Sequence, residues 1–336
     1  MRAVVITKHG GPEMLEVQEH PDPALGPGQV RIDVAAAGIN FADVMARMGL
    51  YADAPKTPCV VGYEVAGTVV ELGAGVAESH PALVPGARVF AGTQFGGYAS
   101  QVVTGAGDVL LLPDELSFEQ GAAIPVNYGT AWAGLIGYGS LRAGDRVLVH
   151  SAGGGVGIAA TQIAKRTGAE VYGTASLGKH ARITELGVDH ALDYTKPGWE
   201  RGLPKFDVIL DAIGGKSFRQ SYALLRPGGR LIAFGASAVV SGERKNIATA
   251  LRTVARMPRF NMIKQMQESK AVIGLNMLTL WKDHGSLDPW IAPMREMLAD
   301  GTVTPVIAGA FPFEQAGAAQ TMIVERRNLG KVVLTP

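Results

Sequence analysis

The first third of the chain alternates apolar and polar residues in short runs that are separated by turns rich in Gly and Pro. Period-two alternation between such turns is typical of β-strands, and the short spacing favours antiparallel neighbours. One helical pattern interrupts the strands, from Asn40 to Met48. We therefore expect a mostly antiparallel β domain over residues 1–123. Its strands are expected at 4–7, 29–38, 64–73, 87–92 and 98–103.

Beyond residue 123 the pattern changes to apolar strands that alternate with helices. The run 146–152 is almost entirely apolar, which suits a strand buried in a parallel sheet, and a helical pattern follows it at 156–168. This alternation predicts a doubly wound α/β domain over residues 124–277. Its further strands are expected at 170–175, 190–194, 206–212, 230–236 and 271–277, with the last helix before 230 at 221–229.

The last part of the chain, 278–336, returns to the mixed pattern of the beginning. We expect it to rejoin the first domain, so that the α/β domain is an insertion. Helices are expected at 290–299 and 314–325, and short strands at 303–308 and 331–334. The segment 241–270 is rich in Met and Arg, and it is expected to form either a helical excursion or a flap.

Composition and charge narrow the functional classes. A net charge of +1 on 336 residues gives no general attraction to nucleic acid. Cys59 is the only cysteine, so intramolecular disulfides and cysteine-built zinc sites are impossible. We expect neither a signal peptide nor a membrane-spanning helix, because no apolar run has the required length. The sequence fits a protein of the cytoplasm.

A glycine-rich loop joins the strand at 146–152 to the helix that follows. Its residues are Ala152, Gly153, Gly154, Gly155, Val156 and Gly157. A strand, loop and helix of this kind bind the pyrophosphate of a dinucleotide. We expect a tight turn at Ala152, a close approach of the backbone to the phosphates at Gly154, and helix–strand packing at Gly157. The helix N-terminus adds free N–H groups. A purely structural turn is the alternative.

The end of the second parallel strand distinguishes the two nicotinamide dinucleotides. An NAD-dependent enzyme usually carries Asp or Glu there. This chain carries Ser176 and Lys179 and no acid between residues 174 and 180. A carboxylate would repel the 2′-phosphate, whereas a hydroxyl and an ammonium group bind it. We therefore expect NADPH. The alternative is that Lys179 is only a solvated residue of the first helical turn.

Motifs spread along the whole chain resemble those of one enzyme superfamily. They are AAAGINFADVMARMGLY (35–51), VVGYEVAGTVVELG (60–73), AAIPVNYGTAW (122–132), HSAGGGVG (150–157), GTASLGKH (173–180) and RRNLGKVVL (326–334). The chain resembles the zinc-free quinone oxidoreductase branch of the medium-chain dehydrogenase/reductase superfamily. The stretches 173–194 and 224–246 are more similar to the vesicle amine transport protein subfamily than to zeta-crystallin.

The resemblance implies a GroES-like catalytic domain, an inserted Rossmann domain and a cleft between them. It implies that the glycine loop holds the pyrophosphate and that Ser176, Lys179 and Tyr194 surround the 2′-phosphate. Tyr194 closes an apolar strand, so packing is its alternative role. The residues implied at the nicotinamide end are Phe234, Gly235, Leu275, Asn276 and Asn328, with Thr130 at the domain junction and Asn40 and Tyr51 facing the cleft.

Zinc-dependent relatives carry a Cys in a G-I-C loop and a His in a G-H-E turn, and this chain carries Asn40 and Tyr63 instead. Without a Lewis acid a simple aldehyde is a poor substrate, whereas quinones and enones delocalise the incoming hydride. We expect Asn40 to donate a hydrogen bond to a carbonyl oxygen, and Tyr51 to stack on a planar acceptor or donate through its hydroxyl. Helix capping by Asn40 and loop packing by Tyr51 are the alternatives.

Three functions remain open. The first is a zinc-free NADPH-dependent quinone oxidoreductase, and the second is an NADPH-dependent 2-alkenal or enone double-bond reductase. The third is a non-enzymatic, nucleotide-responsive lipid or membrane-trafficking protein, whose Met and aromatic residues over 255–281 would contact lipid. Hydrolysis is not expected, because no Ser/His/Asp arrangement emerges and His150 is expected in the core.

The strand at 271–277 is apolar and expected at the edge of the sheet. A bare apolar edge is an aggregation hazard. We therefore expect a homodimer in which this strand pairs with its copy. A monomeric mass at micromolar concentration would contradict it.

Overall fold

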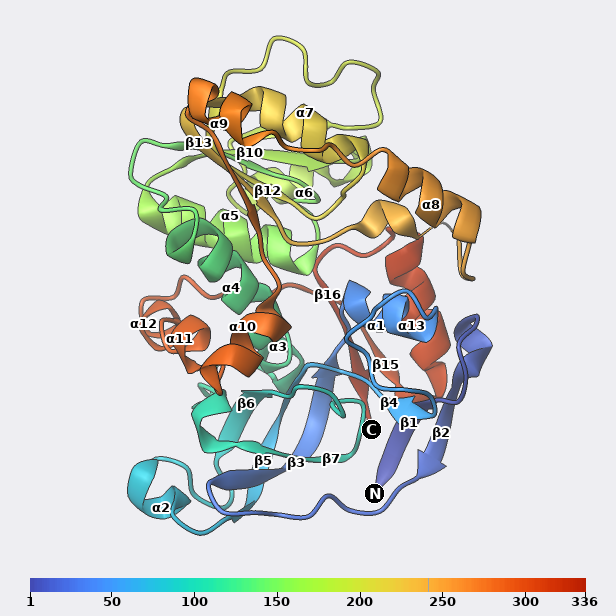
Figure 1. Ribbon diagram of the computed structural model, residues 1–336. Helices are drawn as coiled ribbons and strands as arrows, with labels where there is room; N and C mark the ends of the chain where they lie inside the picture. Colours follow the sequence, from blue (N-terminus) through green and yellow to red (C-terminus); the bar gives the residue numbers. More distant parts are fainter. Residues whose placement is uncertain (241) are drawn as a thin grey trace. The chain divides into compact units, whose positions relative to one another are not determined.

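The computed structural model describes residues 1–240 and 242–336, which form two compact units (Figure 1). The first unit comprises Met1–Val126, Gly242–Lys245 and Leu278–Pro336. The second comprises Asn127–Ser241 and Asn246–Met277. The first unit is therefore assembled from segments that the second unit separates in the sequence.

The first unit is built on antiparallel sheets. A larger sheet has the order β15-β16-β3-β5-β6-β8, with β7 paired to β3, and a smaller one has the order β2-β1-β4. β15 and β16 form the one parallel pair described in these two sheets. The strands are β1 Arg2–Ile6, β2 Leu15–Glu19, β3 Gln29–Gly38, β4 Cys59–Val60, β5 Glu64–Leu72, β6 Arg88–Gly92, β7 Gln101–Gly105, β8 Val109–Leu111, β15 Ile307–Pro312 and β16 Lys331–Thr335.

The centre of the larger sheet depends on one small residue. Val30, Ile32 and Val34 of β3 are buried at alternate positions, as the period-two pattern predicts. Gly67 of β5 pairs with Val34, and a Cβ atom at Gly67 would lie 1.9 Å from the carbonyl oxygen of Asp33. Only glycine allows the two strands to approach so closely.

Short helices complete the first unit. They are α1 Phe41–Arg47, α2 Val76–Ser79, α3 Phe118–Gly121, α10 Met277–His284, α11 Asp288–Ile291, α12 Met294–Ala299 and α13 Ala316–Val324, with 3₁₀ turns at Pro12–Met14, Ala106–Asp108 and Phe313–Gln315. The single helix expected at 290–299 is wrong. Pro293 separates α11 from α12, because proline lacks the N–H that would continue the first helix.

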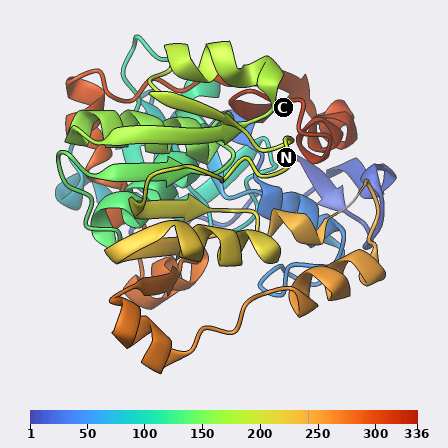
Figure 2. The same ribbon diagram turned by 90° about the horizontal axis from the view of Figure 1, so that it is seen from above.

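The second unit contains one parallel sheet of order β11-β10-β9-β12-β13-β14, and Figure 2 shows its strands side by side. The strand order reverses between β9 and β12, the kind of switch point at which open α/β sheets bind ligands. The strands are β9 Arg146–Val149, β10 Glu170–Ala175, β11 His190–Asp193, β12 Phe206–Asp211, β13 Leu225–Ala233 and β14 Ala271–Gly274. One mostly antiparallel unit and one doubly wound unit confirm the predicted fold class.

The helices of this unit are α4 Pro125–Trp132, α5 Gly155–Thr167, α6 His180–Glu185, α7 Lys216–Leu224, α8 Ile247–Ala255 and α9 Met262–Glu268, with a π-helix at Ala133–Gly137 and 3₁₀ turns at Leu177–Lys179 and Ser237–Val239. The helix expected at 221–229 is wrong beyond Leu224, where β13 begins. Pro227 cannot continue a helix. The segment 241–270 contains α8 and α9, and its first residue lies outside the described residues. β14 lies at one edge of the sheet, as expected, and the homodimer stays a prediction.

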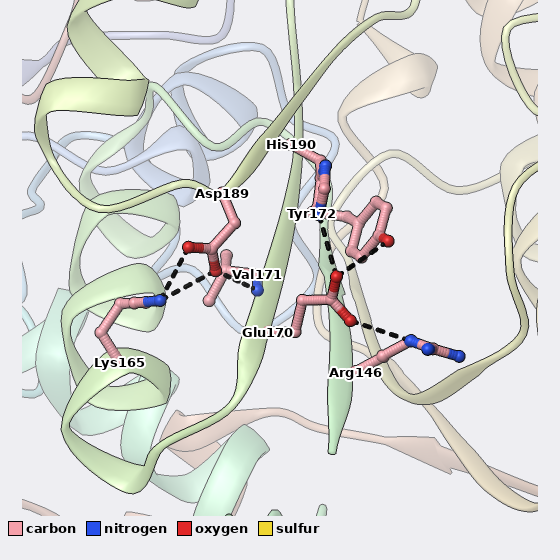
Figure 3. Close-up of polar contacts among 7 residues, drawn as sticks. All are labelled: Arg146, Lys165, Glu170, Val171, Tyr172, Asp189 and His190. Atoms are coloured by element: carbon pink, nitrogen blue, oxygen red, sulfur yellow. Dashed lines mark hydrogen bonds and ion pairs between the residues drawn. The ribbon is translucent and has the colours of Figure 1, made fainter. Parts of the chain in front are cut away.

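Charged side chains cross-link the amino ends of neighbouring parallel strands (Figure 3). Glu170 of β10 accepts a hydrogen bond from Arg146 Nε of β9 at 2.9 Å, and its other oxygen lies 2.9 Å from His190 Nε2 of β11. The hydrogen bonds from Arg146 and His190 lower the pKa of Glu170. Asp189 accepts two hydrogen bonds from Lys165 Nζ of α5, at 2.8 and 2.9 Å. The amino ends of these strands are therefore held together by ion pairs.

Candidate functional site

The glycine loop lies at the carboxyl end of β9. Gly154 is the N-cap of α5, with extended backbone. A Cβ atom at Gly157 would lie 2.3 Å from the carbonyl oxygen of Ser151, so the first turn of α5 packs directly on the loop. The tight turn expected at Ala152 falls one residue earlier, because Ser151 has the left-handed conformation with φ 56°. Ala152 itself is buried and replaces glycine without a positive φ.

Lys179 and Ser176 lie beside this loop. Lys179 Cδ is 3.3 Å from the position that a Cβ atom would take at Gly153, so the lysine stem runs along the glycine loop. Ser176 directly follows β10, and Tyr194 directly follows β11. Because Ala175 pairs with Asp193 in the parallel register, these two side chains leave neighbouring strands at equivalent positions. The structure thus places Lys179 beside the loop, and it places Ser176 and Tyr194 just past paired ends of neighbouring strands.

The residues expected near the nicotinamide follow the next strands of the same edge. Phe234 N donates to Asp211 O at 3.1 Å, and Leu275 N donates to Ala233 O at 2.9 Å. Gly235 follows Phe234, and Asn276 follows the buried Leu275. Thr130 is buried in α4 of the same unit.

Asn40, Tyr51 and Asn328 belong to the first unit. There Asn328 Nδ2 donates to the carbonyl oxygen of Gly330 at 3.0 Å.

A buried chain of hydrogen bonds lies under the loop, and sequence reasoning missed it. Ser221 Oγ donates to Asp211 Oδ2 at 2.7 Å, so His150 Nε2 must donate to Ser221 Oγ at 3.0 Å. His150 Nδ1 then accepts from Thr174 Oγ1 at 3.3 Å. Thr174 Oγ1 in turn accepts from the backbone N–H of Ser151 at 3.2 Å.

Each donor in this series of hydrogen bonds directs its proton away from the glycine loop and toward Asp211. The arrangement requires a neutral His150, and burial lowers the pKa of His150 although the Asp211 charge opposes the shift. Ser221 is fully buried and donates to the carboxylate, so it is no nucleophile. The contacts among Ser221, His150 and Asp211 therefore hold Ser151 in its left-handed conformation, and they do not form a hydrolytic site.

Asn127 is a second residue that the sequence did not reveal. It is buried in α4, and its Nδ2 lies 2.5 Å from the position of a Cβ atom at Gly155. A side chain at position 155 would therefore displace the amide of Asn127, which occupies the space beside the first residue of α5. The available signal was one amide side chain within the apolar stretch 122–132.

In the first unit, Asn40 contacts a buried ion pair. Lys331 Nζ forms an ion pair with Glu64 Oε1 and donates to Asn40 Oδ1 at 2.7 Å. Asn40 Nδ2 donates to Glu64 Oε1 at 3.0 Å, and Glu64 Oε2 accepts from Val126 N at 2.7 Å. Glu64 is 0% and Lys331 3% exposed, whereas Asn40 is half-buried. Sequence reasoning named only Asn40 of these three.

The buried carboxyl group of Asp43 supports the start of α1, next to Asn40. Asp43 accepts hydrogen bonds from Asn40 N at 2.7 Å, Tyr98 Oη at 2.9 Å and Gly62 N at 3.2 Å. It therefore ties the start of α1 to the turn before β5. Burial raises the pKa of Asp43 to about 7, against the hydrogen bonds from Asn40 and Tyr98.

This shift predicts a stability change with pH. The folded protein keeps the Asp43 proton where the unfolded chain, with its ordinary pKa of 3.8, has lost it. The stabilisation is complete below the unfolded value and is lost as the pH rises through about 7. We expect the Tm of the wild type to fall by roughly 5 °C more than that of Asp43→Asn across this range. Parallel Tm curves in differential scanning calorimetry would contradict it.

Tyr51 lies beside a second tyrosine. Its ring centroid is 6.5 Å from that of Tyr63 in an edge-on arrangement, and Tyr63 is 5.1 Å from Phe95. Burial raises the pKa of both tyrosines, so both hydroxyls keep their protons. Tyr51 is therefore packed against an aromatic cluster and still offers a hydroxyl donor.

The donor groups around Asn40 do not fit a zinc ion. The ammonium group of Lys331 already contacts both Glu64 and Asn40, and a divalent cation there would face a fixed positive charge. Zinc sites are built from Cys, His and carboxylate ligands. Over residues 1–240 and 242–336, no group of three or more such side chains is placed to hold a metal.

Two family models match the chain. Residues 26–114 match the alcohol dehydrogenase GroES-like domain, and residues 186–334 match the zinc-binding dehydrogenase model. The first matched range covers β5 with Glu64, and the second covers β16 with Lys331. Although the second model is that of zinc-binding dehydrogenases, the cation that this chain places beside Glu64 is a lysine.

Relatives match over nearly the full length. The synaptic vesicle membrane protein VAT-1 homolog of Danio rerio is 35% identical over 99% of this chain and 70% of its own length, and that of Homo sapiens is 33% identical over 100% and 86%. The crystal structure of the human VAT-1 homolog-like protein aligns with a TM-score of 0.84 at 30% identity, over 100% of this chain and 98% of that one.

Two bacterial structures are similar as well. A mycobacterial protein complexed with NADPH aligns with a TM-score of 0.84 at 28% identity over both whole chains. A quinone oxidoreductase of Pseudomonas syringae aligns with a TM-score of 0.82 at 28% identity, over 100% and 99%. The chain therefore belongs to the medium-chain dehydrogenase/reductase family of oxidoreductases, in the quinone-oxidoreductase-like branch that includes the VAT-1 homologs.

Proposed function

We propose that this protein is a zinc-independent, NADPH-dependent oxidoreductase that reduces a quinone or a related conjugated carbonyl compound. The observation that carries the coenzyme assignment is the stem of Lys179 against Gly153 of the glycine loop. It supports an ammonium group beside the position where the loop and the helix N-terminus of α5 would hold phosphates. The NADPH complex of the mycobacterial relative and the name of the Pseudomonas syringae relative agree with the proposal.

The residues of the second unit fit the coenzyme. Glycine at 153, 154 and 157 keeps side chains away from the loop and from the N-terminus of α5, and Ser176 and Tyr194 add hydroxyl groups at the ends of β10 and β11. Phe234, Gly235, Leu275 and Asn276 are proposed for the nicotinamide end, with Thr130 and Asn328 as further contacts. NADPH, when bound, supplies a hydride from its nicotinamide ring.

The first unit supplies the groups for the acceptor. When hydride adds to a quinone or an enone, negative charge develops on the carbonyl oxygen. We propose that Asn40 donates a hydrogen bond to this oxygen and that Tyr51 packs against the planar acceptor. A proton from solvent then completes the product. Conjugation spreads the charge, so neutral donors are sufficient for this substrate class.

The test is NADPH oxidation measured by absorbance with a panel of 1,4-quinones and 2-alkenals. Turnover of quinones supports the proposal, and Asn40→Ala is expected to lower kcat by about 100-fold, as for one lost oxyanion donor. Exclusive turnover of 2-alkenals would instead favour the enone reductase. No turnover with either class would overturn the oxidoreductase proposal.

A second candidate rests on exposed apolar residues of α8 and α9. Of the residues expected to contact lipid, Met262 and Met266 of α9 are exposed, whereas Trp281 is buried, so the expectation is wrong for Trp281. Ile247, Leu251 and Val254 share one face of α8 and are 56 to 65% exposed, with Arg252 and Arg256 on the same segment. Such a face fits the surface of an anionic membrane. Among residues 1–240 and 242–336, no helix has the length and apolar character needed to span a bilayer. Flotation with anionic liposomes, together with no NADPH oxidation, would favour this candidate.

A further inference from the structure

We infer that Lys331 is a positioning residue that holds the amide of Asn40 in one orientation and serves as the fixed cation at a place where the family name implies a metal. The inference rests on the proposed function for its catalytic consequence. Its geometric part stands on the contacts of Lys331, Glu64 and Asn40 alone.

The two partners leave the Asn40 amide a single orientation. An ammonium group only donates and a carboxylate only accepts. Lys331 Nζ donates to Asn40 Oδ1 at 2.7 Å, while Glu64 Oε1 accepts from Asn40 Nδ2 at 3.0 Å. A flipped amide would place its N–H groups against the ammonium and its oxygen against the carboxylate. The amide oxygen therefore faces Lys331, and Nδ2 keeps a second N–H to offer.

Burial of the Glu64–Lys331 ion pair costs free energy of folding, so a gain in stability does not explain why the pair is there. A buried ion pair loses hydration that its mutual attraction only partly restores, and apolar residues of similar size often replace such a pair without loss of stability. Here Glu64 and Lys331 are buried, and the half-buried Asn40 joins them to the surface. The pair thus acts on the acceptor through Asn40.

Lys331 polarises the amide of Asn40 as well as orienting it. A cation bonded to the amide oxygen withdraws electrons from the nitrogen, which strengthens the remaining N–H as a donor. Glu64 carries the compensating charge, and the backbone N–H of Val126 holds its other oxygen at 2.7 Å. When the hydride reaches the acceptor, the carbonyl oxygen becomes negative and this N–H stabilises it. The electron pair stays on the substrate until solvent protonates the oxygen.

The experiment compares Lys331→Met with the double variant Lys331→Met/Glu64→Gln, which removes both buried charges, and with Lys282→Met as the matched control on the exposed face of α10. Each full-length protein is assayed for quinone reduction, NADPH affinity and Tm. We expect kcat to fall at least about tenfold in both Lys331 variants, with KM and the NADPH affinity changed less than about threefold. The control should match the wild type.

A spectroscopic arm separates this inference from the proposed function. The chain has six asparagines, so selective ¹⁵N-asparagine labelling gives few side-chain amide signals, and loss of one signal in Asn40→Ala assigns it. We expect the two Asn40 amide protons to shift in Lys331→Met and not in Lys282→Met. If the wild type reduces no quinone, these shifts alone decide the orientation.

Two results would overturn the inference. One is a kcat within about twofold of the wild type in folded Lys331→Met or, where that variant does not fold, in the double variant. The other is an Asn40 amide signal that the loss of Lys331 leaves unmoved.

Discussion

Gly157→Ala is expected to lose at least about 100-fold in NADPH affinity, the largest effect of any single methyl group at the proposed coenzyme site. The added Cβ would lie 2.3 Å from the carbonyl oxygen of Ser151 and 2.7 Å from Ala152 Cα, and both are backbone atoms. Neither can rotate away, so the start of α5 must move off the loop. Isothermal titration calorimetry with NADPH measures the loss.

The control is a glycine of the same unit that has room for a methyl group. At Gly137 a Cβ would lie 3.6 Å from the Trp132 ring, an ordinary contact, and Gly137→Ala should bind NADPH like the wild type. Gly153→Ala should fall between the two, because the neighbouring atom is Lys179 Cδ of a flexible side chain. Equal affinities of Gly157→Ala and wild type would show that the loop does not hold the coenzyme.

Lys179→Glu should reverse the coenzyme preference. The substitution replaces the proposed phosphate partner by a carboxylate, which repels the 2′-phosphate and can hold the ribose hydroxyls of NADH. One charge-assisted hydrogen bond contributes about 1.5–3 kcal/mol, so the ratio of NADPH to NADH affinity should fall by about 100-fold.

Lys196→Glu tests whether charge alone explains such a change. Lys196 lies on the same edge, two residues after Tyr194, and should leave the ratio within about threefold. Asp193, which ends β11, accepts two hydrogen bonds from Thr195, at 3.0 and 2.6 Å. A wild type that prefers NADH would point to Asp193 as the ribose partner and would refute the role of Lys179.

The sequence predicted those features that depend on neighbours along the chain. Period-two alternation in β3 and the apolar runs of β9 and β12 gave the two sheet types, because each of these strands carries its own burial pattern. The glycine loop was recognisable because its strand, loop and helix are contiguous. Helix ends were less certain where a proline lies inside an apolar stretch, as at Pro227 and Pro293.

The features that were missed depend on residues far apart in the sequence. Lys331 and Glu64 are 267 positions apart, and a lysine at the start of an apolar strand looks like an exposed end residue. The chain from Ser151 to Asp211 likewise gathers side chains from β10, β12 and α7. Only the strand order and the register place these polar groups in contact, and neither follows from local periodicity.

The insertion of the second unit has a consequence for the order of folding. β3 pairs with β16 through Val333 and Gly38, so this pairing forms only after nearly three hundred further residues have been synthesised beyond β3. The inserted unit makes its contacts between residues that are closer in the sequence. It can therefore fold first, because loop closure between distant residues costs more entropy. Until β16 arrives, the nascent first unit exposes a strand edge, the species most in need of a chaperone.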